Sequence, residues 1–205
     1  MIGFHQFLWR LLALASLLLC SEIALSAPDA WAQCATCHGS DAGGNRALKA
    51  PALAGQKVWY LVRQLENFAS GIRGSHPDDA PGMQMRAMAT TLGDEQRRAL
   101  ADYLSELEPP STQGTRRGDM KNGYRYYQAR CGSCHGSEGQ GNEAFQAPAL
   151  QGLSAQYLDR QMRNFRNGRR GTHPDDKYGR QMSLMADTIS EDEWRDILYF
   201  LTEQR

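Results

Sequence analysis

The sequence predicts an all-α protein made of two tandem helical domains. Apolar residues recur at three- and four-residue spacing in both halves of the 205-residue chain, and no segment shows sustained alternation with a period of two. The second half also repeats the first at a constant offset of 97 residues. Two copies are too few for a solenoid, so the repeat indicates two similar domains in a row.

The composition narrows the possible function classes. The chain has 23 basic and 23 acidic side chains and therefore no net charge. This balance argues against a nucleic-acid-binding protein, which needs a strongly positive surface. Its hydrophobic content of 41% lies below the level usual for globular chains, which predicts modest cores. Small domains with modest cores usually need a disulfide, a metal or a cofactor to remain folded.

Residues 1–26 are expected to form a signal peptide that is removed on export. The apolar run over residues 11–20 is too short to span a bilayer, which requires about 20 residues. Ala24, Leu25 and Ser26 form a small-residue cleavage site, and an uncleaved anchor is the alternative. Cys20 lies inside this segment as an apolar residue. The mature chain therefore keeps four cysteines, which are Cys34, Cys37, Cys131 and Cys134.

The repeat defines the expected domain boundaries. Cys34 aligns with Cys131, and roughly half of the positions between Cys34 and Leu104 are identical to their counterparts. The segment 109–117 begins with two prolines and is rich in turn-forming residues, so it is the expected linker. The predicted domains are residues 27–108 and residues 118–205.

Each copy is expected to contain a central amphipathic helix and a last helix. The central stripes are Val58, Leu61, Leu65 and Phe68 in the first copy, and Ala155, Leu158, Met162 and Phe165 in the second. The last helices carry Leu100, Tyr103, Leu104 and Leu107, and Ile197, Phe200 and Leu201. Ser190 and Glu193 form a capping box for the final helix. All these stripes are interpreted as core.

Each copy also contains the motif C-x-x-C-H, which ends at His38 in the first copy and at His135 in the second. On a helix the two thiols and the imidazole share one face. This spacing lets the cysteines bond covalently to the vinyl groups of a haem while the histidine reaches the iron. The sequence therefore predicts two covalently bound haem c groups, attached through Cys34, Cys37, Cys131 and Cys134.

Cysteines at this spacing also occur in three other kinds of site. A thioredoxin-like redox site would follow a strand, and none is evident here. A closed zinc site needs four ligands, whereas each copy supplies only two cysteines and one histidine in the motif. Structural disulfides within the C-x-x-C loops remain an alternative in an exported chain.

The two motifs, the downstream methionines and the tandem repeat together resemble the dihaem cytochrome c4 family over nearly the whole mature chain. The resemblance implies two class I cytochrome c domains, each a small helical bundle around one haem. It also implies that Met85 and Met182 are the second axial ligands of the two irons. Both methionines lie seven residues before the point where the last helix is expected to begin, at Leu92 and Ile189.

In this family a proline-containing loop lies below the proximal histidine. The resemblance therefore implies that the carbonyl groups of Pro51 and Pro148 accept hydrogen bonds from Nδ1 of His38 and His135. Such a bond would fix the orientation of the imidazole ring and its basicity.

Two alternatives for the second axial ligand remain at this stage. Met88 and Met185 lie about one helical turn further on, and their expected role is packing at the haem edge. His76 and His173 would give haems of lower potential. Each of these histidines begins a repeated His-Pro-Asp-Asp segment, which is typical of a surface turn or a helix start. The sequence assigns this repeated turn no role.

The two copies differ at their beginnings and in charge. The second opens with a helix start over residues 123–127, whereas the first has only residues 27–31, so its first helix must be short and its haem less protected.

Residues 27–108 carry 8 basic and 10 acidic groups, and residues 109–205 carry 14 and 12. Five arginines concentrate the basic charge of the second copy, at positions 160, 163, 166, 169 and 170. They are expected to form a solvated helix face, with a contact to a partner or to a haem propionate as the alternative.

Taken together, these features predict an electron carrier rather than an enzyme. Methionine ligation would fill the sixth iron position and favour outer-sphere electron transfer. The resemblance implies a periplasmic protein, free or peripherally associated with the membrane, that carries electrons from a quinol-oxidising complex to a terminal oxidase. A cytochrome subunit of a dehydrogenase or oxidase is the main alternative. A dihaem peroxidase is disfavoured because it needs an open iron site. A sulfur-compound dehydrogenase is disfavoured because it would need a cysteine as an iron ligand, whereas haem attachment uses every cysteine of the mature chain.

Overall fold

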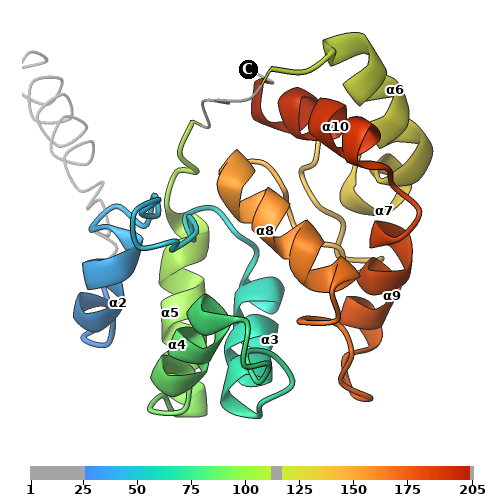
Figure 1. The fold of residues 1–205 in the computed structure, drawn as a ribbon. Coiled ribbons are helices and arrows are strands. Elements are labelled where there is room, and N and C mark those ends of the chain that lie inside the picture. The colour runs from blue at the N-terminus through green and yellow to red at the C-terminus, as the bar shows by residue number, and fades with distance from the viewer. Residues whose placement is uncertain (1–25, 112–116, 204–205) are drawn as a thin grey trace, which may run out of the picture.

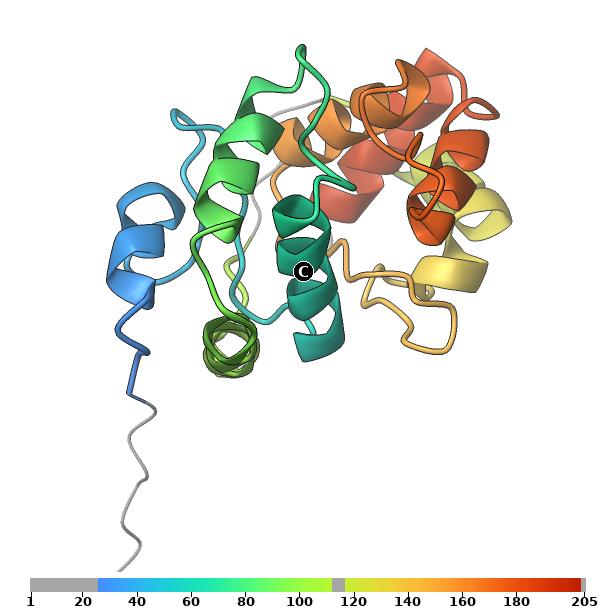
Figure 2. The ribbon, with the colours of Figure 1, turned by 90° about the horizontal axis from the view of Figure 1, so that it is seen from below.

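The computed structural model describes residues 26–111 and 117–203, which form two groups of helices (Figures 1 and 2). Apart from Ser26, the predicted signal peptide lies outside the described residues. The first group contains α2 (Trp31–His38), α3 (Val58–Ala69), α4 (Ala80–Ala89) and α5 (Asp94–Glu106). The second contains α6 (Met120–Arg130), α7 (Gly132–His135), α8 (Ala155–Arg166), α9 (Lys177–Ala186) and α10 (Glu191–Glu203). The only β-type pairings of the described residues are two isolated bridges, so the all-α prediction is confirmed.

In the first domain α3 packs against α4 and α5, and α2 lies at the outer edge (Figure 1). The predicted stripes supply the core, because Leu61 of α3 and Leu100 and Leu104 of α5 are all buried. Trp31 of α2 joins this cluster, and its ring lies 5.9 Å from that of Tyr103. This core holds α2, which carries the first C-x-x-C-H motif, against α5.

The second domain has a larger apolar core, in which α10 packs against both α6 and α8. Trp194, Ile197, Leu198 and Leu201 of α10 are buried there, together with Tyr127 of α6. The predicted capping box is present, since Ser190 Oγ accepts from the backbone N–H of Glu193 and the Glu193 carboxylate accepts from that of Ser190. The helix begins at Glu191 and not at Ile189, and α5 likewise begins at Asp94 and not at Leu92. The predicted starts were two residues early, because the capping residue in each domain follows the apolar residue.

The repeated His-Pro-Asp-Asp segment starts the helix that carries the candidate methionine ligand. Asp79 Oδ1 accepts from the N–H of Gly82 in the first turn of α4 at 3.2 Å, and Asp176 caps α9 in the same way. His76 Nδ1 accepts from the N–H of Asp78 at 3.1 Å, which closes the turn before the cap. The second domain makes the equivalent bond between His173 and Asp175 at 3.1 Å. The repeated turn therefore has a structural role in positioning α4 and α9.

The two domains meet through α3 and α8, and several hydrogen bonds of polar side chains cross this boundary. Arg73 is 7% exposed, and it donates to Gln64 Oε1 at 2.6 Å, to Gln161 Oε1 at 3.0 Å and to the Tyr157 hydroxyl at 3.2 Å. Its counterpart Arg170 donates to the same two oxygens, to Gln161 Oε1 at 2.8 Å and to Gln64 Oε1 at 3.1 Å. Since positions 73 and 170, and 64 and 161, each differ by 97, the contact has approximate two-fold symmetry.

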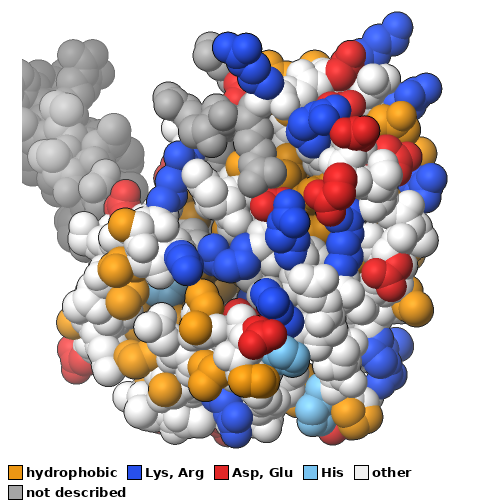
Figure 3. All heavy atoms as spheres, in the orientation of Figure 1, with side chains coloured by type: hydrophobic (Ala, Val, Ile, Leu, Met, Phe, Trp, Pro, Cys, Tyr) orange, Lys and Arg blue, Asp and Glu red, His pale blue; other side chains and the backbone are white. Residues whose placement is uncertain are grey.

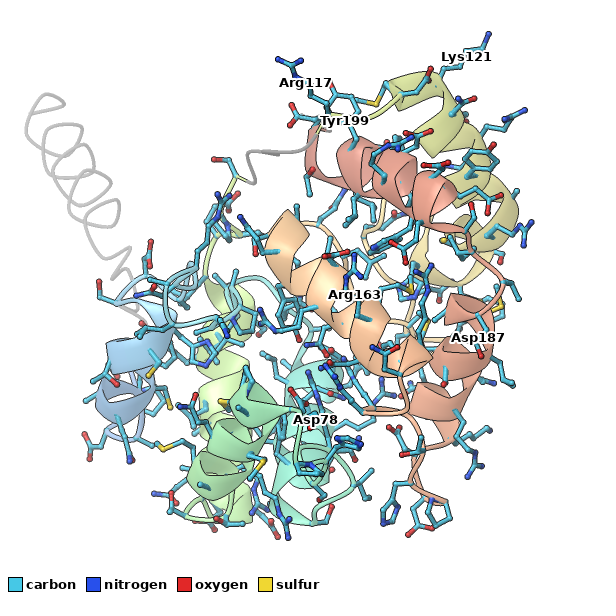
Figure 4. All side chains as sticks on the ribbon, in the orientation of Figure 1. Asp78, Arg117, Lys121, Arg163, Asp187 and Tyr199 are labelled. Atoms are coloured by element: carbon cyan, nitrogen blue, oxygen red, sulfur yellow. The ribbon has the colours of Figure 1, made fainter. Side chains whose placement is uncertain are left out.

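The arginines of the second copy do not form a merely solvated face, so that prediction was wrong. Arg160, Arg169 and Arg170 all contact the first domain. Arg163 and Arg166 instead bond within the second domain, to Glu191 and to nearby acceptors. Basic side chains accordingly gather over α8 and along the domain boundary (Figure 3), where Asp78, which pairs with Arg169 at 3.5 Å, is also found (Figure 4).

The described part of the chain contains no helix that is long and apolar enough to cross a membrane.

Candidate haem sites

The two C-x-x-C-H motifs lie at helix ends in both domains. Cys34, Cys37 and His38 belong to α2, which ends at the histidine. In the second domain α6 ends at Arg130, Cys131 adopts φ −120° and ψ −40°, and the short helix α7 carries the motif to His135. In each motif the first cysteine is half-buried and the second is exposed. None of these four cysteines forms a disulfide, so the structure does not favour the disulfide interpretation.

Each proximal histidine is buried and held by the carbonyl group of a proline. His38 is 4% exposed and its Nδ1 lies 2.8 Å from the carbonyl oxygen of Pro51. His135 is 6% exposed and lies 2.8 Å from that of Pro148. Because a carbonyl only accepts, Nδ1 carries the proton and Nε2 is left with its lone pair for a metal.

Burial also keeps these imidazoles neutral. It lowers the pKa of His38 and of His135, and the hydrogen bond to the proline carbonyl opposes this shift only in part. A neutral imidazole with a free Nε2 is the form that binds iron. The structure thus presents both histidines in the ligand state.

A cavity of about 810 Å³ opens beside His38 in the first domain. Its apolar walls come from α3 and α5, through Leu61, Phe68, Leu100 and Leu104. The corresponding residues of the second domain, Leu158, Phe165, Ile197 and Leu201, are buried as well. Apolar walls around one metal-binding side chain are typical of a cofactor site.

The same cavity provides positive charge for an anionic cofactor. Arg73 and Arg160 both line it, and the buried Nε atom of each has no partner among the described residues. A buried guanidinium N–H without an acceptor is costly, so these atoms suit the propionate groups of a haem. Apolar walls, a proximal imidazole, two adjacent cysteines and guanidinium groups together match the chemistry of haem c.

Two methionines of α4 face this cavity, and their surroundings differ. Met85 and Met88 both line it, but Sδ of Met88 accepts from Gln33 Nε2 at 3.9 Å, whereas Sδ of Met85 accepts no hydrogen bond from the described residues. In the second domain Met182 packs against the core while Met185 is 39% exposed. These surroundings favour Met85 and Met182 as ligands, and their ligation stays a prediction.

The structure brings neither His76 nor His173 into the lining of the described cavity. Both ring Nδ1 atoms already accept backbone hydrogen bonds in the turns described above. No group of three or more His, Cys, Asp or Glu side chains that could hold a metal ion exists within 26–111 and 117–203. A protein-only zinc site therefore has no support there.

Residues 29–108 and 120–204 match the sequence pattern of the Cytochrome c family. The thiosulfate dehydrogenase electron acceptor of Stutzerimonas stutzeri is 36% identical over 75% of this chain and 72% of its own length. Cytochrome c4 of Azotobacter vinelandii is 30% identical over 74% of this chain and 76% of its own length. In structure, cytochrome c4 of Acidithiobacillus ferrooxidans matches with a TM-score of 0.70 at 26% identity, over 84% of this chain and 99% of that one.

Two repeated helical domains, each built on a C-x-x-C-H motif, define a tandem c-type cytochrome. Each domain carries one covalently bound haem c. The chain belongs to the cytochrome c family and, within it, to the dihaem cytochromes c4. It is an electron carrier of the type that this family provides.

Sequence reasoning did not predict that the haem site of the first domain takes residues from the second domain. Leu153, Tyr157, Arg160 and Gln161 belong to the second domain, yet they line the cavity of the first. The only feature of the sequence that pointed to these residues was the concentration of arginines after position 159, and a cluster of arginines does not indicate which domain their side chains contact.

Proposed function

We propose that this protein is a periplasmic electron shuttle that accepts electrons from a quinol-oxidising complex and passes them to a terminal oxidase. The observation that carries the proposal is the cavity of the first domain, which is lined both by the buried, oriented His38 and by Met85 of α4. The second domain repeats this arrangement in sequence, with a buried, oriented His135 and with Met182 against its core. When bound, the haem supplies one-electron chemistry, and a filled sixth position favours electron transfer over substrate binding. The export signal predicted from the sequence supports the periplasmic location.

A second partner system is favoured by the comparisons. A relative that is 36% identical is named as an electron acceptor of thiosulfate dehydrogenase. A second, from Thiomonas intermedia, bears the same name at 34% identity over 79% of its length. The candidate function is therefore to accept electrons from a thiosulfate-oxidising enzyme, with the same two haems and without turning over thiosulfate itself.

The two candidates are separated by measuring reduction rates with each donor. Oxidised holoprotein would be mixed anaerobically with quinol and a quinol-oxidising complex, or with thiosulfate and a thiosulfate dehydrogenase, and haem reduction followed optically. Fast reduction that saturates with protein concentration in one system only would identify the donor. Slow reduction in both would contradict the shuttle proposal.

Carbon monoxide tests whether the protein is only a carrier. Both reduced haems are expected to remain six-coordinate, so carbon monoxide should not change their spectra. Ready binding at one haem would reveal an open iron site. The peroxidase-type alternative would then replace the shuttle.

A further inference from the structure

One contact between the domains is made twice, once in each direction. Arg160 of α8 donates through Nη2 to the backbone carbonyl of Lys49 at 2.6 Å. Its counterpart Arg63 of α3 donates to the carbonyl of Gln146 at 2.9 Å and to its Oε1 at 2.8 Å. Positions 63 and 160, like 49 and 146, differ by 97. Each domain thus sends one arginine to the same place on the other.

The carbonyl that accepts belongs to an unusual residue in each loop. Lys49 has φ 58° and Gln146 has φ 55°, which lie in the left-handed region although neither is glycine. Such a conformation is strained for a residue with a side chain and persists only where surrounding contacts support it. The bridge between Asn45 and Ala50 closes the first loop around this residue, with bonds of 2.9 Å in both directions. The arginine of the other domain adds a support from outside.

This loop leads directly to the group that orients the proximal histidine. Two residues after Lys49 comes Pro51, whose carbonyl accepts from His38 Nδ1. Two residues after Gln146 comes Pro148, which holds His135. The strength of that hydrogen bond sets the basicity of the imidazole and, through it, the haem potential.

We propose that Arg160 and Arg63 are positioning residues that act across the domain boundary. Arg160 steadies the loop that orients His38, and Arg63 steadies the loop that orients His135. The geometry of each haem site is therefore completed by the opposite domain. This coupling needs only the two haem sites and holds for any electron donor or acceptor.

The guanidinium groups are themselves held in place. The Arg63 guanidinium carbon lies 4.9 Å from the ring centre of Trp59 and 4.7 Å from that of Tyr178, so it contacts two aromatic rings. That of Arg160 lies 5.3 Å from the ring centre of Tyr157. A planar, fixed group of this kind is not replaced by the flexible ammonium of lysine.

Positioning and simple charge predict opposite changes in potential. A looser loop weakens the bond from His38 Nδ1, makes the imidazole less basic, stabilises ferric iron less and raises the potential of the first haem. Loss of a nearby positive charge instead stabilises ferric iron and lowers the potential. Arg160→Lys keeps the charge but loses the guanidinium Nε that suits a propionate, and weaker neutralisation of a propionate would also lower the potential. A rise in the potential of the first haem alone therefore identifies the positioning effect, and it is the expected result.

Hydrogen exchange provides a readout that does not depend on electron transfer. In reduced holoprotein, Arg160→Met is expected to speed exchange of the His38 Nδ1 proton by about tenfold or more, measured by NMR, while His135 is unchanged. Arg63→Met should produce the mirror image. Arg169→Met is the matched control, because Arg169 crosses the boundary to Asp78 without touching either loop.

Three results would overturn the proposal. The first is unchanged His38 exchange in Arg160→Met, even if the potential falls, because the residue would then act by charge alone. The second is an equal change at both histidines, which would indicate general loosening of the domain contact. The third is an unchanged first-haem potential in Arg160→Lys when backbone exchange in α5 matches the wild type.

Discussion

Gly123 of α6 lies directly against the backbone carbonyl of Asp196 of α10. A Cβ atom at residue 123 would overlap that carbonyl oxygen, so the two helices approach as closely as glycine permits. The carboxylate of Asp196 also accepts from the N–H of Asp119, the residue that caps α6, at 3.1 Å. This pair of residues holds the first helix of the second domain on its last helix.

Gly123→Ala is therefore expected to destabilise the second domain by about 1–3 kcal/mol, because a methyl group must separate the helices. The free energy of unfolding would be measured by denaturant titration of the reduced holoprotein. Gly93→Ala is the control for steric overlap, since a Cβ there would have only Gln96 Oε1 nearby, at 3.8 Å, and its cost should be limited to the weaker capping of α5 by alanine. Equal stability losses in the two variants would contradict this account of the α6–α10 contact.

The hydroxyl of Tyr127 should make the stability of the protein fall in alkaline solution. Tyr127 is fully buried and donates to the carbonyl of Gly136 at 2.7 Å, and burial raises its pKa. Its folded-state pKa thus exceeds the unfolded value near 10, so the contribution is complete below about pH 10 and is lost above it.

At neutral pH, Tyr127→Phe should cost about 1 kcal/mol through loss of the hydrogen bond. Above pH 10 the stability advantage of the wild type over this variant should shrink by about 1.4 kcal/mol per pH unit. Denaturation of the reduced protein at neutral pH and above pH 10 would measure this difference. An advantage that stays constant with pH would show that Tyr127 ionises equally in both states.

Replacing the axial methionine should change one haem only. Met85→Ala is expected to remove the far-red methionine-to-ferric-iron band of the first haem and to lower its potential, because methionine ligation raises haem potentials. Met88→Ala is the matched variant on the same helix and should keep the band. An optical redox titration would follow both haems. The opposite pattern would assign the iron to Met88.

Arg73→Met should weaken the union of the two domains. It removes the donor to the buried Tyr157 hydroxyl and leaves Arg170 as the remaining donor to Gln64 and Gln161, which is expected to cost about 1–3 kcal/mol. Scanning calorimetry should show two separated transitions where the wild type shows one. Arg98→Gln removes an exposed arginine that pairs with Asp102 and should cost less than about 1 kcal/mol. A single, unshifted transition in Arg73→Met would contradict the prediction.

Much of the fold could be predicted because the repeat presents each signal twice. The stripe from Val58 to Phe68 predicts α3, and the same stripe 97 residues later predicts α8. The motifs that end at His38 and His135 predict haem attachment, because few other chemistries use this spacing. Helix starts were less accurate, since Leu92 and Ile189 precede the capping residue and belong to the core without being helical.

The sequence could not predict how the domains face each other. Arg160, Arg169 and Arg170 lie on or just after α8, in a cluster of arginines that is typical of a solvated face, yet each contacts the other domain. The sequence around an arginine that contacts another domain does not differ from the sequence around one that is exposed to solvent. The repeated His-Pro-Asp-Asp turn was likewise without a role until the structure placed its last aspartate at a helix start.

The reciprocal contacts between the domains have a consequence for how strong they must be. A contact that two separate copies of one domain could make symmetrically is here made within a single chain, so the linker holds the two partners at an effective concentration in the millimolar range. The contact therefore needs little affinity of its own and can consist largely of polar groups. Directional hydrogen bonds between polar groups fix the relative orientation of the two domains. Electron transfer between the two haems depends on this orientation more than on a high affinity between the domains.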